Sequence, residues 1–125
     1  MDDHYYEISK VLSALAYYKS VAENDKKKVN YNYIDKVANA SSKDMALYYL
    51  REALRDFSTL KSSDEEMQKA LERLLKVAGD IDYSKLESEL NELEKSESLS
   101  KLRQMLSKIG AEALLLGNQM FGGGS

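Results

Sequence analysis

Residues 99–116, LSKLRQMLSKIGAEALLL, carry the longest regular hydrophobic pattern of the chain. Apolar side chains recur every three or four positions, as they do along the buried face of an α-helix; they are Leu99, Leu102, Leu106, Ile109, Ala113 and Leu116. We expect Gly117 to end this helix and residues 119–125, QMFGGGS, to form a flexible, glycine-rich tail. Gly110 weakens the helix by about 1 kcal/mol relative to alanine and leaves room for a neighbouring backbone to approach.

A leucine stripe runs from residue 86 to residue 116 and has two interpretations. A polar break at residues 96–98, Ser-Glu-Ser, divides it into halves. An antiparallel helical hairpin within one bundle explains two such halves. The alternative is a coiled-coil seam that pairs with a partner helix.

The same helical spacing extends over the rest of the chain, which contains no proline to interrupt it. We expect earlier helices over about 3–23, 33–38 and 41–60. Ser63 with Glu66, and Ser84 with Glu87, form capping boxes that predict the starts of two more helices. Asn39 is expected to adopt the left-handed conformation that often ends a helix.

These patterns predict an all-α fold, a compact bundle of five to six helices with almost no strand. A chain of 125 residues suits a single domain, which we expect to span residues 1–118. A hydrophobic share of 43% with a charged share of 31% is typical of a folded protein.

The composition argues against several classes of function. There is no cysteine and one histidine, His4, so we expect no disulfide, no metal site and no cofactor. The motifs of common catalytic centres are missing, and we expect a non-enzymatic protein. No apolar run reaches the roughly 18–20 residues that cross a bilayer. We therefore expect a cytoplasmic protein that acts on neither a membrane nor a small-molecule substrate.

The charge differs between the two halves of the chain. Residues 1–62 carry ten Lys and Arg against nine Asp and Glu, a net charge of +1, whereas residues 63–125 carry eight against twelve, a net charge of −4. Neither half is strongly basic, which argues against a free-standing DNA-binding domain of high affinity. Contact with nucleic acid inside a larger assembly is compatible with these charges.

Eight of the nine tyrosines lie within the first 49 residues, several of them in adjacent pairs. Adjacent side chains on a helix point about 100° apart. We therefore expect each pair to bury one ring and to keep the other at the rim of the core, with its hydroxyl in water. This concentration of tyrosine indicates that the N-terminal helices present a contact surface.

Tyr48, Arg51 and Arg55 are the main candidate site residues. On the helix predicted over 41–60, the residues that share an apolar stripe face the core; they are Ala46, Leu50, Ala53 and Phe57. The three candidates lie on the opposite side, where a tyrosine ring can stack on a base and an arginine can bind phosphate. The alternatives are a contact with another protein and a solvated face with ion pairs to Asp44 and Glu52.

Lys26, Lys27 and Lys28 form the densest basic cluster and follow the first predicted helix. One interpretation is a loop that contacts phosphate. The other is a set of cations that stabilises the negative end of the preceding helix or is simply solvated. Lys36 and Lys43 complete the residues that we expect to contact a nucleic-acid strand.

Residues 31–57, YNYIDKVANASSKDMALYYLREALRDF, resemble the central region of the small helical subunit of archaeal type I-A CRISPR surveillance (Cascade) complexes. The similar features are the aromatic lead-in that ends in YIDK at 33–36, the ANAS break at 38–41, and the LREALRDF helix at 50–57. The resemblance covers about a fifth of the chain.

The resemblance implies a structural, non-catalytic subunit. Several copies would stack head-to-tail beside the backbone and large subunits that hold the guide RNA, and would stabilise the opened target DNA. Weak contacts to the DNA backbone suffice there, because guide pairing supplies the sequence specificity. The alternatives are a helical protein–protein interaction module and the small subunit of a type III CRISPR complex, without nucleic-acid binding of its own.

Overall fold

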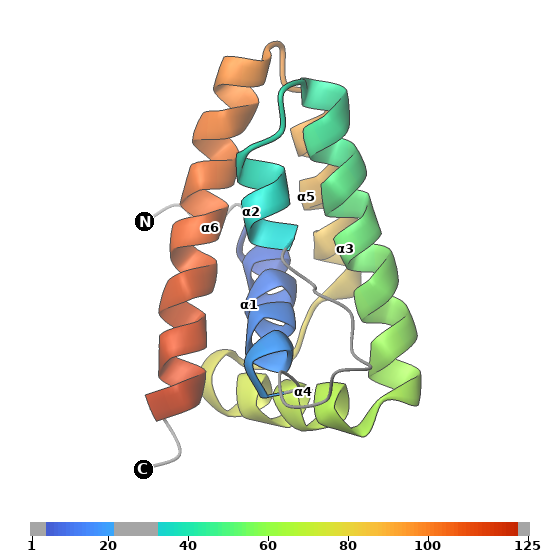
Figure 1. Ribbon diagram of the computed structural model, residues 1–125, viewed down its shortest axis with the longest axis vertical. Helices are drawn as coiled ribbons and strands as arrows, with labels where there is room; N and C mark the ends of the chain where they lie inside the picture. The colour runs from blue at the N-terminus through green and yellow to red at the C-terminus, as the bar shows by residue number, and fades with distance from the viewer. Residues whose placement is uncertain (1–4, 22–32, 123–125) are drawn as a thin grey trace.

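The computed structural model describes residues 5–21 and 33–122, which form six α-helices and no strand (Figure 1). The helices are α1 (Tyr6–Val21), α2 (Tyr33–Ala38), α3 (Lys43–Ser63), α4 (Glu65–Ala78), α5 (Tyr83–Glu94) and α6 (Leu99–Gly122). Apolar side chains from all six join one hydrophobic core. The predicted all-α bundle of five to six helices is confirmed.

Helix α1 occupies the centre of the bundle (Figure 1) and packs against α3, α4, α5 and α6. Every residue from Glu7 to Leu15 is buried, including Ser9, Lys10 and Ser13. A helix that is covered on all sides has no solvent-facing polar stripe. Its buried polar side chains therefore need hydrogen-bond partners inside the protein.

Helices α3, α4, α5 and α6 present apolar faces to α1. Helix α3 buries the stripe that the sequence predicts, Ala46, Leu50, Ala53 and Phe57. Helices α5 and α6 follow one another in the chain, but both pack on α1, and α6 makes its most extensive contact there. Both leucine stripes are buried in the same core, as the predicted hairpin within one bundle requires. They face the central helix rather than each other.

Two of the predicted helix starts are displaced by nearby aspartates. Helix α4 is capped by Asp64, whose carboxylate accepts the backbone N–H groups of Glu66 and Met67, while Ser63 is still the last residue of α3. Helix α5 is capped by Asp82, not by Ser84. An ionised carboxylate is at least as good an N-cap as a serine hydroxyl and also interacts favourably with the helix dipole.

Asn39 does not adopt the expected left-handed conformation. Among the described residues, positive φ occurs at Gly79 alone. The chain leaves α2 through ordinary backbone hydrogen bonds, from Asn39 N–H to the Asp35 carbonyl and from Ala40 N–H to the Val37 carbonyl. The last carbonyls of α2 are thus partly satisfied without a left-handed residue.

Helix α6 continues beyond Gly117, so the domain does not end at residue 118. The first part of the predicted tail, 119–125, is helical, and Met120 within it is completely buried. Burial of this side chain outweighs the low helix propensity of glycine. Although α6 has 24 residues, no helix in the described part of the chain is long and apolar enough to cross a membrane.

Met120→Ala tests this extension of α6. We expect the free energy of unfolding to fall by about 2–3 kcal/mol, because a buried methionine is truncated at a site that can partly relax. Gln119→Ala, on the exposed side of the same turn, is the control and is expected to change stability by less than about 0.5 kcal/mol. Urea unfolding followed by circular dichroism measures both variants. Equal, small effects would show that this turn does not contribute to the core.

Candidate functional site

The outward face of α3 carries three of the candidate residues. The Tyr48 side chain is 59% exposed, and the Arg51 and Arg55 side chains are 53% and 73% exposed. The buried stripe lies on the other side of the helix, as its spacing predicts. A tyrosine ring and two guanidinium groups are therefore presented together at the protein surface.

Both arginines already have acidic partners. Arg51 forms an ion pair with Glu94 of α5, and the Arg55 Nη1 atom lies 3.1 Å from the Glu52 Oε2 atom one turn away on α3. The pair with Glu52 is one that the sequence allows, whereas Glu94 reaches Arg51 only because α5 packs nearby. Exposed pairs of this kind stabilise a protein by roughly 0–1 kcal/mol. They are weak enough to exchange for another anion.

Lys36 extends this surface onto α2. Its Nζ atom lies 5.8 Å from the centroid of the Tyr33 ring and 5.9 Å from that of Tyr49, within the range of a cation–π interaction. The Tyr49 ring contacts that of Tyr48 edge-to-face, with the centroids 5.7 Å apart. We call Lys36, Tyr48, Arg51 and Arg55 the α2–α3 face. It combines one exposed aromatic ring with three cations.

Lys43 does not join this face. Lys43 donates a hydrogen bond from Nζ to the Ser96 carbonyl, 2.5 Å away, and so ties the start of α3 to the α5–α6 connection. Lys26, Lys27 and Lys28 lie outside the described residues. In the structure Lys43 therefore serves to connect two segments of the bundle.

Two buried tyrosines, Tyr33 and Tyr18, use their hydroxyl groups inside the protein. Tyr33 donates to the Asp56 carboxylate, and burial raises the pKa of Asp56 above its ordinary value. Tyr18 donates to Asp64 Oδ2 over 2.9 Å. Tyr17 and Tyr18 are both buried, so the expectation that one ring of each pair stays at the rim is wrong for this pair.

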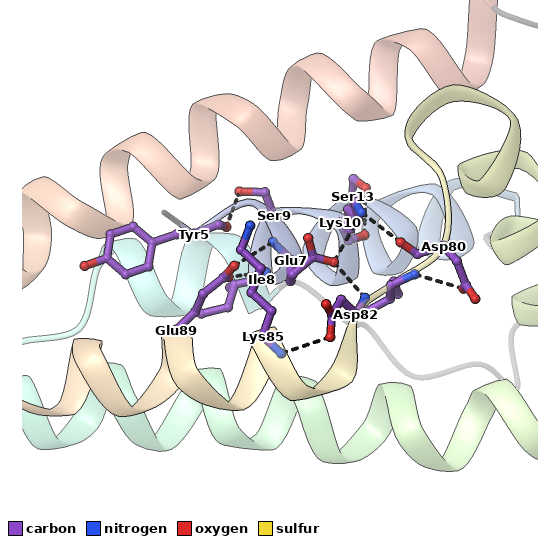
Figure 2. A network of polar contacts seen from close by, with 11 residues as sticks. Tyr5, Glu7, Ile8, Ser9, Lys10, Ser13, Asp80, Asp82, Lys85 and Glu89 are labelled. Carbon is purple, nitrogen blue, oxygen red and sulfur yellow. Dashed lines mark hydrogen bonds and ion pairs between the residues drawn. The ribbon is translucent and has the colours of Figure 1, made fainter. Parts of the chain in front are cut away.

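A second cluster of charged residues lies at the start of α1 (Figure 2). The Glu89 carboxylate of α5 accepts the backbone N–H groups of Glu7, at 3.1 Å, and of Ile8, at 2.9 Å. The carbonyl of Tyr5 accepts the first bond of the helix, so a residue without a capping side chain occupies the N-cap position. Glu89 therefore supplies the N-cap of α1 from another helix.

Glu7 and Lys10 connect the same end of α1 to the α4–α5 connection (Figure 2). The Glu7 Oε1 atom accepts Lys10 Nζ at 3.2 Å and the Asp82 backbone N–H at 2.8 Å. Lys10 Nζ also donates to the Asp80 carbonyl at 2.8 Å. Each charged group in this cluster has a partner inside the bundle, which is the condition for burying it. We conclude that the cluster positions α1.

Sequence reasoning did not single out Glu89, although the sequence carries a signal for it. Leu86, Leu90 and Leu93 form the buried stripe of α5, and Glu89 lies three residues after the first and four before the last. A carboxylate inside an apolar stripe faces the core. In the described residues, no group of three or more His, Cys, Asp or Glu is arranged to hold a metal ion.

Glu89→Ala removes the acceptor of two buried N–H groups. We expect the free energy of unfolding to fall by about 2–4 kcal/mol, because each buried, unpaired amide costs about 1–3 kcal/mol. Glu87→Ala, at an exposed position of the same helix, is the matched control and is expected to stay within about 0.5 kcal/mol of the unaltered chain. Urea unfolding measures both changes. A loss at Glu89 no larger than the control would show that α1 does not need this cap.

Glu89 also predicts a pH dependence of stability. Burial raises its pKa above the ordinary value of 4.5, although the N–H donors of Ile8 and Glu7 act in the opposite direction. The native chain therefore binds this proton at a higher pH than the unfolded chain does. The contribution of Glu89 to the free energy of unfolding falls as the pH rises from about 4.5 through the raised pKa, and returns as the pH falls.

Glu89→Gln, which does not titrate, isolates this effect. We expect the stability of the unaltered chain relative to the variant to decline as the pH rises from about 4.5 through the raised pKa of Glu89. Because burial raises the pKa of Asp56 as well, the quantity to compare is the difference between the two proteins in urea unfolding at each pH. A difference that stays constant over this range would contradict the prediction.

Comparison with known proteins places the chain in a family. No family model matches it, and no solved structure matches it. It is similar to an uncharacterized protein of Archaeoglobus fulgidus, with 39% identity over 117 residues. The similarity covers 93% of this chain and 90% of that relative, so the two correspond over nearly their whole lengths. The chain therefore belongs to the same protein family as this archaeal relative.

Proposed function

We propose that the protein is a non-catalytic small subunit of an RNA-guided type I-A CRISPR surveillance complex. In this role several copies stack within the complex and stabilise the opened target DNA through weak backbone contacts. The partners are other copies of the chain, the backbone and large subunits, and the target DNA and guide RNA that the complex holds. The proposed place of action is the cytoplasm.

The observation that supports this proposal is the exposure of the α2–α3 face. Residues 33–57 of the stretch that resembles the Cascade small subunit include α2 and the first part of α3, the two helices that carry this face. Tyr48 is exposed beside Arg51, Arg55 and Lys36, a combination that suits a single strand because a ring stacks on any base and cations track the phosphates. The organism of the relative, an archaeon, is compatible with an archaeal complex.

Weak binding by one copy is compatible with this role. The pairs with Glu94 and Glu52 reduce the charge available from Arg51 and Arg55. In an assembly, neighbouring copies present the same face repeatedly, and the effective concentration of linked sites multiplies weak contacts. Guide pairing, not the small subunit, then supplies the sequence specificity.

The ion pairs favour a second candidate function. A face on which each arginine has a carboxylate partner is also suited to another protein, since arginine and tyrosine are enriched at protein interfaces. In this alternative the protein is a helical interaction module, or the small subunit of a type III CRISPR complex, and binds no nucleic acid itself. The two candidates differ in what the α2–α3 face binds.

Salt-dependent binding of a labelled single-stranded oligothymidylate tests the proposal. We expect weak binding that fades steeply between low and physiological salt. For Arg51→Ala combined with Arg55→Ala, the negative slope of log affinity against log salt should become shallower by about 1.4, because each phosphate contact on a single strand contributes about 0.7 to its magnitude. Lys101→Ala with Lys108→Ala removes the same charge from exposed positions of α6 and should leave the slope unchanged.

A reverse variant separates the two candidates. Glu52→Gln combined with Glu94→Gln removes the partners of both arginines and should strengthen binding of the oligothymidylate several-fold at low salt. Binding that does not depend on salt, an equal loss in the α6 control, or no gain in the glutamine variant would argue for the protein-interaction module instead.

A further inference from the structure

Two tyrosine rings are exposed in the described part of the chain, Tyr48 at 59% and Tyr83 at 41%. The Lys61 ammonium group lies 3.8 Å from the centroid of the Tyr83 ring, so one face of that ring is already covered. No cation of the described residues covers Tyr48 in this way. Its edge-to-face contact with Tyr49 covers at most one of its two faces. Tyr48 therefore offers a flat aromatic surface to a ligand.

The Tyr48 ring is held in place by its neighbour. The Tyr49 ring, 5.7 Å away between centroids, is half-buried and packs against the hydrophobic core. An exposed side chain that is braced in this manner loses less conformational freedom when a ligand binds. The contact thus prepares Tyr48 for stacking.

Lys36 is the one cation of the α2–α3 face that has no carboxylate partner among the described residues. Arg51 and Arg55 each pair with a glutamate, whereas Lys36 makes no ion pair with any described residue. Its ammonium group lies near the rings of Tyr33 and Tyr49, which position the charge without neutralising it. Lys36 can therefore bind an anion without first losing a carboxylate.

Contacts between α2 and α3 bring this ammonium group close to the exposed ring. Tyr33, at the start of α2, donates a hydrogen bond to Asp56 of α3. Lys36, one turn further along α2, reaches the ring of Tyr49, nearer the start of α3. The two helices therefore run in opposite directions, and both Lys36 and Tyr48 contact the ring of Tyr49. A flat apolar surface and a free cation thus lie on the two sides of one side chain.

We propose that the α2–α3 face holds an unpaired nucleobase on Tyr48 and the adjoining phosphate at Lys36, and so selects single-stranded over double-stranded nucleic acid. The inference rests on the proposed function, in which this face contacts the opened DNA. In a duplex each base is covered by its neighbours in the stack, and freeing it costs unpairing and unstacking energy. An unpaired strand offers its base faces directly.

The same geometry sets the length of strand that one copy contacts. From Tyr48 to Arg55 the axis of α3 advances about 10 Å. This is the length of about three stacked nucleotides at 3.4 Å each. The strand runs along α3, with one base on Tyr48 and its phosphates at Lys36 and the two arginines.

Three labelled probes of equal length test the proposal. They are an oligothymidylate, a strand with the same phosphates and sugars but no bases, and a duplex of thymidylate with adenylate. Binding to the full chain at low salt is followed by fluorescence anisotropy. We expect the oligothymidylate to bind at least about fivefold more tightly than either of the others, because it alone presents free bases for stacking.

Variants of the chain assign the two contacts. Tyr48→Leu should weaken binding of the oligothymidylate about fivefold or more, leave its salt slope unchanged and not affect the base-free strand, whereas Tyr48→Phe should retain the affinity. Tyr83→Leu, at an exposed tyrosine that also lies beside a lysine, is the matched control and should change affinity by less than about twofold. Lys36→Met should make the salt slope shallower by about 0.7 on both single strands. Circular dichroism establishes that each variant is folded.

The outcomes separate this inference from the proposed function. Equal binding of the oligothymidylate and the base-free strand, equal binding of the duplex, or equal losses in Tyr48→Leu and Tyr83→Leu would overturn the inference. Salt-dependent binding of phosphates would then still support the proposed function. A loss in Tyr48→Leu that is as large on the base-free strand would assign the ring a structural role instead. Absence of salt-dependent binding to all three probes would overturn both.

Discussion

The carboxylate of Glu89 on the first N–H groups of α1 is the interaction on which the bundle depends. α1 is surrounded by four other helices, and a helix end enclosed in protein has no water to satisfy its free donors. Tyr5 lacks a side chain that can cap, so the acceptor comes from α5, 81 and 82 residues further along the chain. This contact fixes where α1 starts and how α5 lies against it, and α6 then packs on the helix so positioned.

Residue spacing was sufficient to predict the elements but not how they meet. The stripe of α3 and the leucines of α6 follow a 3.6-residue period, which packing preserves. The sequence offers two adjacent N-caps for α4, Ser63 and Asp64, and the structure uses Asp64 because Ser63 is still part of α3. The extension of α6 depended on burial of Met120, and the pairing of Arg51 with Glu94 on the packing of α5. These are tertiary effects that no local pattern encodes.

In the candidate site, too, some features were predictable from the sequence and others depend on how the helices pack. The exposure of Tyr48, Arg51 and Arg55 follows from the buried stripe behind them, and so was predictable. The ion pairs of the two arginines were predictable only in part. Glu52, the partner of Arg55, lies on the same helix, whereas Glu94, the partner of Arg51, lies on α5. Lys43 shows the limit of reasoning from charge alone: its ammonium group is committed to a carbonyl of the α5–α6 connection. Composition identifies cations, and the fold decides which are free to bind.

Asp64 is a single residue that joins three elements. Its backbone N–H bonds to the Leu60 carbonyl at the end of α3, its carboxylate caps α4, and the same group accepts the hydroxyl of Tyr18 from α1. No linker separates α3 from α4, so the elbow between them has little freedom to bend. A ligand on α3 would consequently meet a preorganised scaffold, and little of its binding energy would be spent on ordering the protein.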